Sequence, residues 1–444
     1  MTKKLFIKTF GCQMNVYDSA RIADIMRGLG YEETDSPENA DMVVFNTCHI
    51  REKASEKIFS ELGRFKPIKE ARRKEGKDLI IVVAGCVVQA ESDEFMNRAK
   101  FVDIAMGPQT YHRLPEMLRK LQDKNKHLRI IDTDFPAEPK FDFLPDARAT
   151  GVSSFLAIQE GCDRFCSYCV VPYTRGAEYS RDAAGILKEA RELADSGTKE
   201  IMLLGQNVNA WHGEGLDGNT WDLSRLIAKI AEIDGIWRIR YTTSYPSDFT
   251  DDMIAMHRDI PKVMPYLHLP VQSGSDRVLK AMNRRYTRAQ YENVIEKLRA
   301  ARPDIALSSD FITGFPGETE EDFEQTMDLV KNVGFAQSYS FKYSARPGTP
   351  AAGMKNQIDE NVKGERLERL QALLMQQHSD FNAGFKGKTV DVLPESVGRK
   401  PGTLLGHSPQ MQNVVFNGDA SLIGKIVPVR ITKTTAAALE GEAV

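Results

Sequence analysis

The placement of six cysteines constrains the fold of this 444-residue chain more than any other feature. They are Cys12, Cys48, Cys86, Cys162, Cys166 and Cys169. An even number permits three disulfides, but the start MTKKLFIKTFGC is not a secretory signal, and no run reaches the roughly eighteen apolar residues of a membrane span. We therefore expect a cytoplasmic protein whose cysteines bind metal or an iron–sulfur cluster.

The first third of the chain alternates strand-like and helical segments, which predicts an open parallel α/β sheet. Strands are predicted at Leu5–Phe10, Met42–Phe45 and Leu79–Ala84, and helices at Val16–Leu29, capped by Asn15 or Gly30, and at Arg51–Lys74. A cysteine closely follows each strand: Cys12, Cys48 and Cys86, here called the strand-end cysteines. Carboxyl ends of parallel strands share one edge, so these thiols should meet in one crevice. The alternative is that each is a small buried hydrophobe.

The loop CDRFCSYC places Cys162, Cys166 and Cys169, here called the loop cysteines, around one site. A zinc knuckle would need a fourth ligand, and the next histidine, His212, is far along the chain. Each set of three thiolates leaves one iron of a four-iron cluster open to another ligand, which favours catalysis. A two-cluster electron-transfer protein remains an alternative.

The pattern CxxxCxΦC, with an aromatic residue at Tyr168, resembles the signature of radical S-adenosylmethionine enzymes. With the strand-end cysteines, the chain resembles the methylthiotransferases of that superfamily. Longer strings resemble the branch that makes 2-methylthio-N6-dimethylallyladenosine in tRNA: NTCHIREKASEK, EGCDRFCSYCVVPYTRG, LLGQNVNAW, LHLPVQSGS, SSDFITGFPGET and SYSFKYSARPGTPA. Sibling branches act on threonylcarbamoyl-adenosine in tRNA or on a ribosomal-protein aspartate. A non-catalytic tRNA-binding module with structural zinc or unligated cysteines is the other alternative.

This resemblance implies two [4Fe-4S] clusters and two molecules of S-adenosylmethionine per turnover. The cluster on the loop cysteines would generate a 5′-deoxyadenosyl radical, which removes hydrogen from C2 of N6-(dimethylallyl)adenosine at position 37 of tRNA, next to the anticodon. The cluster on the strand-end cysteines would carry the methylthio group that is transferred to C2. The implied partners are tRNA and an electron donor such as flavodoxin or ferredoxin, with the sulfur donor open. No side chain beyond the cluster ligands is expected to be catalytic.

The middle of the chain continues the alternation. Strands are predicted at Phe155–Ile158, Glu200–Leu204, Ile236–Thr242, Tyr266–Val271, Ala306–Ile312 and Tyr339–Tyr343. Six strands are two short of a full barrel, and the resemblance implies a partial, open (βα)6 barrel. Residues at its rim are expected to contact S-adenosylmethionine together with Tyr168: Gln206, Asn207, Gln272, Ser273 and Gly314. His268 is either a hydrogen-bonded barrel histidine or a substrate or cosubstrate contact.

The last part of the chain predicts a long helix and a small β-barrel. The helix covers Asn361–Phe385, and strands follow at Thr389–Leu393, Val414–Phe416 and Ile426–Thr432. Although the whole chain has a net charge of -3, the segment 384–433 is mildly basic, which suits an OB-like, RNA-binding barrel. Its position resembles that of the TRAM domain of methylthiotransferases. We predict domains at 1–145 with the second cluster, 146–380 with the radical barrel, and 381–444 with the TRAM-like barrel.

Overall fold

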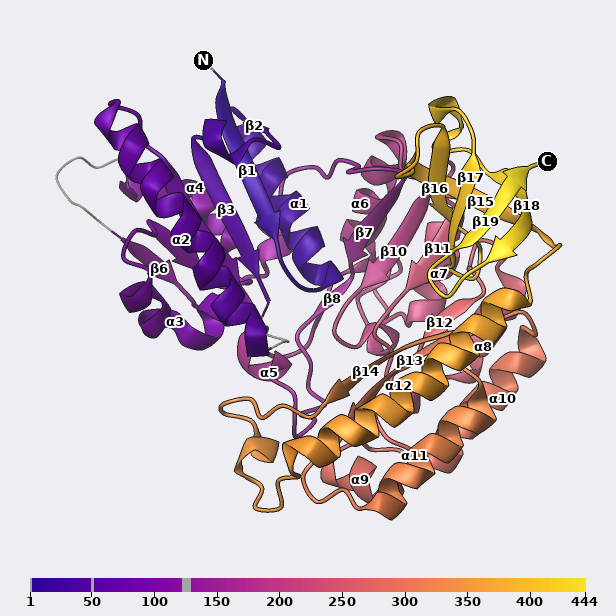
Figure 1. Cartoon of the computed structure of the whole chain (residues 1–444). Helices are drawn as coiled ribbons and strands as arrows, with labels where there is room; N and C mark the ends of the chain where they lie inside the picture. The colour runs from indigo at the N-terminus through magenta and orange to yellow at the C-terminus, as the bar shows by residue number, and fades with distance from the viewer. Residues whose placement is uncertain (1, 49–51, 122–128) are drawn as a thin grey trace. The chain divides into compact units, whose positions relative to one another are not determined.

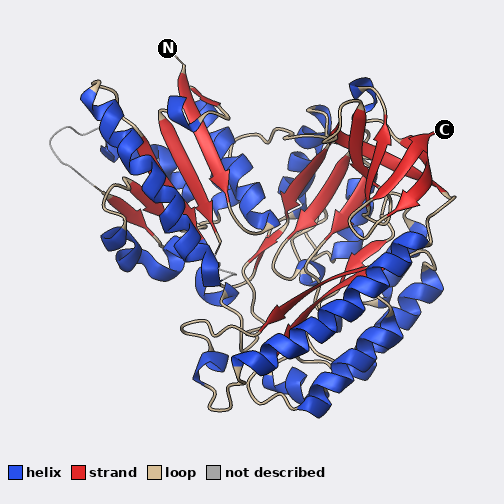
Figure 2. Cartoon of the chain, in the orientation of Figure 1, coloured by secondary structure: helices blue, strands red, loops and turns tan. Residues whose placement is uncertain are grey.

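The computed structural model describes residues 2–48, 52–121 and 129–444, whose helices, strands and connecting loops are shown in Figure 2. They fall into two compact units. The first unit comprises Met1–Arg148, Glu160–Asp163 and Val170–Tyr179, and the second comprises Ala149–Gln159, Arg164–Cys169 and Ser180–Val444. Cys162 therefore belongs to the first unit, whereas Cys166 and Cys169 belong to the second. Among the helices described, none is long and apolar enough to cross a membrane.

The first unit is built on a six-stranded parallel sheet with the strand order β2-β1-β3-β4-β5-β6 (Figure 1). The strands are β1 (Lys3–Thr9), β2 (Tyr31–Glu33), β3 (Met42–Thr47), β4 (Ile80–Gly85), β5 (Ile104–Met106) and β6 (Ile130–Asp132). This confirms the predicted open parallel sheet, and β1, β3 and β4 are the three strands predicted. They are adjacent, so their carboxyl ends lie side by side at one edge of the sheet.

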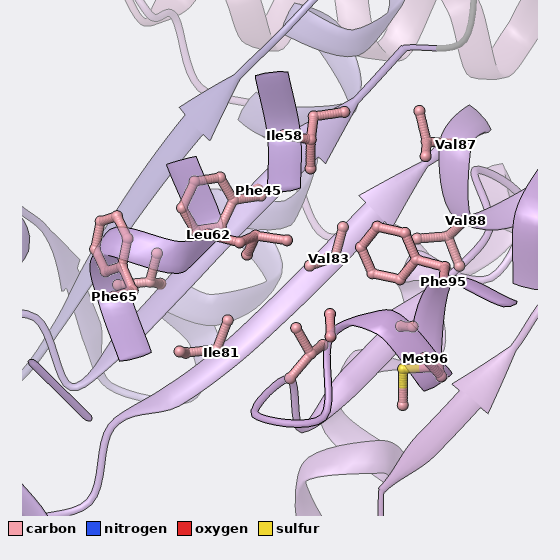
Figure 3. Packing of buried hydrophobic residues seen from close by; sticks show 14 of the residues in the cluster. Phe45, Ile58, Leu62, Phe65, Ile81, Val83, Val87, Val88, Phe95 and Met96 are labelled. Carbon is pink, nitrogen blue, oxygen red and sulfur yellow. The ribbon is translucent and has the colours of Figure 1, made fainter. Parts of the chain in front are cut away.

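Helices cover both faces of this sheet because its strands alternate apolar side chains between the two faces. Helices α2 (Glu52–Lys74) and α3 (Cys86–Arg98) enclose one core with Val43 and Phe45 of β3. Figure 3 shows Phe45 and Phe65 in this core, with ring centroids 5.1 Å apart and edge-to-face geometry. Met42 and Val44 face the second core, which α1 (Gln13–Gly28) and α4 (Leu114–Leu121) cover. Two cores of this kind are typical of a doubly wound sheet.

A cysteine lies at the amino end of two helices of the first unit. Helix α1 starts earlier than predicted, with Cys12 as its N-cap, so the prediction of Asn15 as the cap is wrong; Gly30, with φ +80°, follows its other end. Helix α3 starts at Cys86. Helix α2 matches the predicted charged helix, whose expected first residue, Arg51, lies outside the described residues. The amino ends of α1 and α3 therefore place partial positive charge beside two thiols.

The second unit begins with six strands in two three-stranded parallel sheets. One sheet contains β7 (Ser153–Ala157), β10 (Glu200–Leu204) and β11 (Arg238–Tyr241), and the other contains β12 (Tyr266–His268), β13 (Ala306–Thr313) and β14 (Gln337–Lys342). A parallel bridge between Ile239 and Val263 connects β11 with the residues that precede β12. This arrangement confirms the predicted partial α/β barrel, in which the carboxyl ends of the strands form one rim. Two further short strands, β8 (Gln159–Glu160) and β9 (Tyr179–Ser180), pair with each other.

Six helices alternate with these strands, and an Asp, Ser or Thr side chain caps the amino end of each one. They are α6 (Ala183–Asp195), α7 (Leu223–Ala231), α8 (Asp251–Asp259), α9 (Asp276–Ala281), α10 (Arg288–Ala301) and α11 (Glu320–Val333). The short helix α5 (Val171–Thr174) follows the loop cysteines and belongs to the first unit. Local sequence thus fixes where each helix starts.

A long helix and a closed five-stranded barrel complete the second unit. Helix α12 (Glu360–Ala383) is the predicted long helix. The barrel closes in the order β15-β16-β17-β19-β18 around an apolar core. Its strands are β15 (Thr389–Val397), β16 (Thr403–His407), β17 (Asn413–Asn417), β18 (Val427–Thr434) and β19 (Leu439–Ala443). The predicted OB-like barrel is confirmed, although β16 and β19 were not among the predicted strands.

Two buried arginines of β11 attach this barrel to the larger one. Arg240 donates to the carbonyl oxygens of Ser408 at 2.9 Å and Pro409 at 2.8 Å. Arg238 donates to those of His407 at 2.9 Å and Asp391 at 2.8 Å. Glu200 of β10 lies 3.0 Å from the Arg240 guanidinium and balances its charge. The contact is therefore made by fixed, charge-assisted hydrogen bonds.

Candidate functional site

The strand-end cysteines come together at the carboxyl edge of the first unit's sheet. Cys12 caps α1, Cys48 directly follows β3, and Cys86 begins α3. The Cys48 thiol donates a hydrogen bond to the sulfur of Cys12, which also interacts electrostatically with Cys86. Three thiols from distant parts of the sequence thus lie at one end of the sheet.

Two glycines make this approach possible. Gly11 has φ +103°, and a Cβ added there would lie 2.1 Å from the Cβ of Cys48. Gly85 has φ +100°, and its Cβ would lie 2.3 Å from the carbonyl oxygen of Thr47. Any side chain at either position would push the cysteine-bearing segments apart, and both backbone conformations strongly favour glycine.

The surroundings act differently on the pKa values of the thiols. The hydrogen bond from Cys48, assisted by the positive charge of Arg175, lowers the pKa of Cys12 to about 6. Burial raises the pKa of Cys86, and the charge of Arg175 opposes that rise. Cys12 is therefore mostly a thiolate at neutral pH, which is the form that binds iron.

A buried network of four charges lies beside these thiols, and the sequence analysis did not foresee it. Arg175 donates to Glu160 at 2.7 Å and to Asp18 at 2.7 Å. Lys140 donates to the same Glu160 oxygen at 2.7 Å and lies 3.4 Å from Asp18. All four side chains are buried. Two cations and two anions balance, as buried charges require.

The donor set at the strand-end site can be compared with what a metal centre requires. Among the described residues, no group of three His, Cys, Asp or Glu side chains is placed to hold a single metal ion. Three thiolates are one short of the four ligands that close a cubane cluster. The donor set, three cysteines with one lowered pKa, also suits iron–sulfur chemistry. The residues present therefore fit a cluster with one open iron.

Two of the loop cysteines, Cys166 and Cys169, lie in a structured turn of the second unit. The amide of Cys169 donates to the carbonyl oxygen of Cys166 at 2.9 Å. Tyr168 packs its ring into an apolar cluster with Met282, Phe315 and Tyr343, and burial raises its pKa well above the usual value. A half-buried, un-ionised tyrosine at this position can support the loop through packing.

Arg284 is a further residue of the site that the sequence pattern does not predict. Its guanidinium lies 3.6 Å from the sulfur of Cys166 and donates to the carbonyl oxygen of Pro270 at 2.6 Å. It also stacks 4.3 Å from the ring centre of Tyr245. The only sequence signal is its place in the run NRRY after α9, which does not distinguish it from a surface arginine.

The predicted rim residues follow strands β10, β12 and β13. The amides of Gln206 and Asn207 both donate to Gln159 Oε1, at 2.9 and 3.1 Å, and the Asn207 side chain donates to Asp248 at 2.9 Å. Gln272, after β12, has φ +71°, a conformation uncommon outside glycine. Strained backbone of this kind is concentrated at functional sites.

Two further rim positions, Ser273 and Gly314, contact residues of α11, of the loop before it and of α12. The Ser273 hydroxyl lies 3.3 Å from that of Thr326 in α11. The Gly314 amide donates to Glu318 at 2.9 Å, and a Cβ at Gly314 would meet the Lys363 side chain at 2.3 Å. Both loops are thus fixed in place before any ligand binds.

His268 faces a polar part of the barrel. Its Nδ1 lies 2.9 Å from the Ser308 hydroxyl, and its Nε2 lies 3.5 Å from a carboxylate oxygen of Asp310. The ring also meets Tyr339 edge-on at 6.2 Å between centroids. These contacts agree with the interpretation of a hydrogen-bonded barrel histidine.

Comparison with known families gives three matches along the chain. Residues 4–107 match the family described as Uncharacterized protein family UPF0004. Residues 156–330 match the Radical SAM superfamily, and residues 385–444 match the TRAM domain. The three matches follow one another in the order of the sheet, the partial barrel and the closed barrel.

Solved structures share the fold at low sequence identity. The radical S-adenosylmethionine methyltransferase TsrM from Kitasatospora setae, with cobalamin and a [4Fe-4S] cluster bound, is 13% identical, with a TM-score of 0.59 over 79% of this chain and 77% of that one. The cobalamin-dependent S-adenosylmethionine radical enzyme OxsB, with aqua-cobalamin and S-adenosylmethionine bound, is 12% identical, with a TM-score of 0.51 over 84% of this chain and 56% of that one. At these identities the likeness concerns the fold.

Proposed function

This chain belongs to the radical S-adenosylmethionine methylthiotransferases of the MiaB type, and we propose that it methylthiolates C2 of N6-(dimethylallyl)adenosine next to the anticodon of tRNA. Radical S-adenosylmethionine enzymes use a [4Fe-4S] cluster and S-adenosylmethionine. The substrate rests on the strings quoted above and on the TRAM match. The reaction would take place in the cytoplasm, where the tRNA is found.

The observation that carries the proposal is the gathering of the strand-end cysteines. Three thiols at one edge of the sheet, with a hydrogen bond between Cys12 and Cys48, suit a second cluster in addition to the one on the loop cysteines. A methylthiotransferase needs a place to hold sulfur apart from the site that cleaves S-adenosylmethionine. The first unit, whose residues 4–107 match the family UPF0004, would supply that second set of ligands.

When bound, the cofactors supply the hydrogen abstraction and the sulfur that no side chain can supply. The chain's own residues bind and orient these groups and exclude water from the site. The loop cysteines and the strand-end cysteines would hold the two clusters. Gln206, Asn207, Gln272, Ser273, Gly314 and Tyr168 are proposed to contact S-adenosylmethionine. Their hydrogen-bonded loops would fix its orientation before reaction.

The closed barrel is proposed to bind the tRNA. The TRAM match and the mildly basic segment 384–433 support RNA binding. The four hydrogen bonds from Arg238 and Arg240 hold this barrel against β11. A fixed RNA-binding barrel would present the anticodon loop at a constant position, from which the target adenine must be unstacked.

Mass spectrometry of tRNA nucleosides tests the substrate. In a strain that lacks this gene, 2-methylthio-N6-dimethylallyladenosine should disappear and N6-dimethylallyladenosine should accumulate. The wild-type gene should restore the product, whereas the variants Cys48→Ala and Cys166→Ala should not. Normal product levels in the deletion strain would refute the substrate, and loss of the methylthiolated threonylcarbamoyl-adenosine would point to the sibling reaction.

A second assay tests the enzyme class itself. The reduced protein should convert S-adenosylmethionine to 5′-deoxyadenosine, and Cys166→Ala should abolish this product. Because Cys48→Ala leaves the loop cysteines intact, it should still form 5′-deoxyadenosine while losing methylthiolation. A protein with two clusters that only transfers electrons would form none.

A further inference from the structure

Arg175 is a buried cation beside two of the strand-end cysteines. Its side chain is 3% exposed. Its Nη2 donates at 3.1 Å to the Asn15 Oδ1 that also accepts from the Cys12 thiol at 3.7 Å, and its charge acts on both Cys12 and Cys86. The sequence places it six residues after the last loop cysteine, Cys169. The same stretch of chain therefore supplies ligands for one proposed cluster and a charge for the other.

The guanidinium is held in one orientation. Nη1 donates to Glu160 at 2.7 Å, and Nη2 donates to Asp18 at 2.7 Å and to Asn15 at 3.1 Å. Asn15 is itself fixed, because its amide donates to the carbonyl oxygen of Phe10 at 2.9 Å. The backbone is fixed as well, since Gln109 donates to the Arg175 carbonyl oxygen at 2.9 Å. A planar fork with this many partners cannot turn away from the thiols.

Lys140 belongs to the same network but has different surroundings. Its ammonium donates to Glu160 at 2.7 Å and to the carbonyl oxygen of Pro108 at 2.9 Å, and lies 4.4 Å from the ring centre of Tyr111. These contacts are with a carboxylate, a carbonyl oxygen and a ring, whereas Arg175 also acts on Cys12 and Cys86. Both cations are buried and share Glu160 and Asp18 as partners, so Lys140 is a matched control for Arg175.

We propose that Arg175 is a positioning residue that holds a fixed positive charge against Cys12 and Cys86 and thereby raises the reduction potential of the cluster on the strand-end cysteines. Reduction adds one negative charge to a cluster, and a nearby cation in a water-poor site stabilises that charge. Partners that are not ligands tune metal sites in this way. The inference rests on the proposed second cluster.

An EPR-monitored redox titration tests this assignment in a full-length chain with Cys162, Cys166 and Cys169 replaced by alanine, so that only the strand-end site can bind a cluster. Arg175→Gln should favour the oxidised cluster at least tenfold, which is a shift of about 59 mV to lower potential for one electron. Arg175→Lys keeps the positive charge but loses the planar guanidinium, so its reduction potential should lie between those of the parent and Arg175→Gln. Lys140→Gln should shift the potential less than Arg175→Gln. Equal shifts for Arg175→Gln and Lys140→Gln, or no shift for Arg175→Gln, would overturn the assignment.

Iron content separates this inference from the proposed function. If the parent chain binds about four irons and Arg175→Gln leaves the potential unchanged, only the role of Arg175 is wrong. If the parent binds no cluster, the second cluster and the role of Arg175 both fail. If Arg175→Gln takes up no iron, its potential cannot be measured, and Arg175→Lys is compared with Lys140→Gln instead. A shift in reduction potential for Arg175→Lys that is no larger than the shift for Lys140→Gln then overturns the assignment.

Discussion

Replacing Arg240 by methionine should loosen the closed barrel from the strand that carries it. The change removes two charge-assisted hydrogen bonds, to Ser408 at 2.9 Å and Pro409 at 2.8 Å, and leaves Glu200 buried without its 3.0 Å partner. Each such hydrogen bond contributes about 1.5 to 3 kcal/mol, so the loss of two costs about 3 to 6 kcal/mol. Arg238, which lies 3.9 Å from the other Glu200 oxygen, still neutralises that carboxylate, so we expect the free energy of unfolding to fall by about 3 to 6 kcal/mol.

Tryptophan fluorescence in a urea titration reports the unfolding of the second unit, to which Arg240 and the closed barrel belong. All three tryptophans, Trp211, Trp221 and Trp237, belong to the second unit. The control Lys229→Met removes an exposed ion pair with Glu232 and should change the free energy of unfolding by less than about 0.5 kcal/mol. A loss for Arg240→Met as small as the control's would show that the arginine does not hold the barrel in place.

Three further predictions concern separate parts of the chain. Burial lowers the pKa of His257 to about 3, so the unfolded chain takes up a proton below pH 6.5 that the folded chain refuses. Between pH 7 and pH 5 the wild type should therefore lose about 2 kcal/mol more stability than His257→Gln in urea titrations, and parallel curves would contradict this. Gly11→Ala should prevent iron binding at the strand-end cysteines while 5′-deoxyadenosine formation continues; full iron content would refute the steric argument. Phe95 is fully buried in the core of the first unit, so Phe95→Ala leaves a cavity and should lower the free energy of unfolding by about 3 to 5 kcal/mol. Circular dichroism in urea measures this change, and a loss below about 1 kcal/mol would contradict it.

The elements that position the strand-end cysteines are predictable because their signal is local. Strands β3 and β4 are nearly continuous apolar runs, and the cysteines follow within a few residues. The three-residue strands β2, β5 and β6 are too short to show any periodicity. In the closed barrel, β19 has the sequence LEGEA, which has low strand propensity, and it forms only because β17 and β18 pair with it on either side.

The charged network beside the thiols could not be predicted, for a different physical reason. Arg175 and Asp18 are 157 positions apart, and each looks like an ordinary solvated charge in its own segment. Their burial depends on tertiary contacts between the segment after the loop cysteines and α1. Local patterns carry no information about such long-range pairs. The same reason explains why Arg284, beside Cys166, was missed.

The central claim is that a second cluster binds to the strand-end cysteines. Analysis of iron and acid-labile sulfide in the anaerobically reconstituted full chain tests it most directly. The wild type should bind about eight irons, and alanine at all three strand-end positions or at all three loop positions should leave about four. A wild type that binds only about four irons, unchanged when Cys12, Cys48 and Cys86 are replaced, would contradict the account.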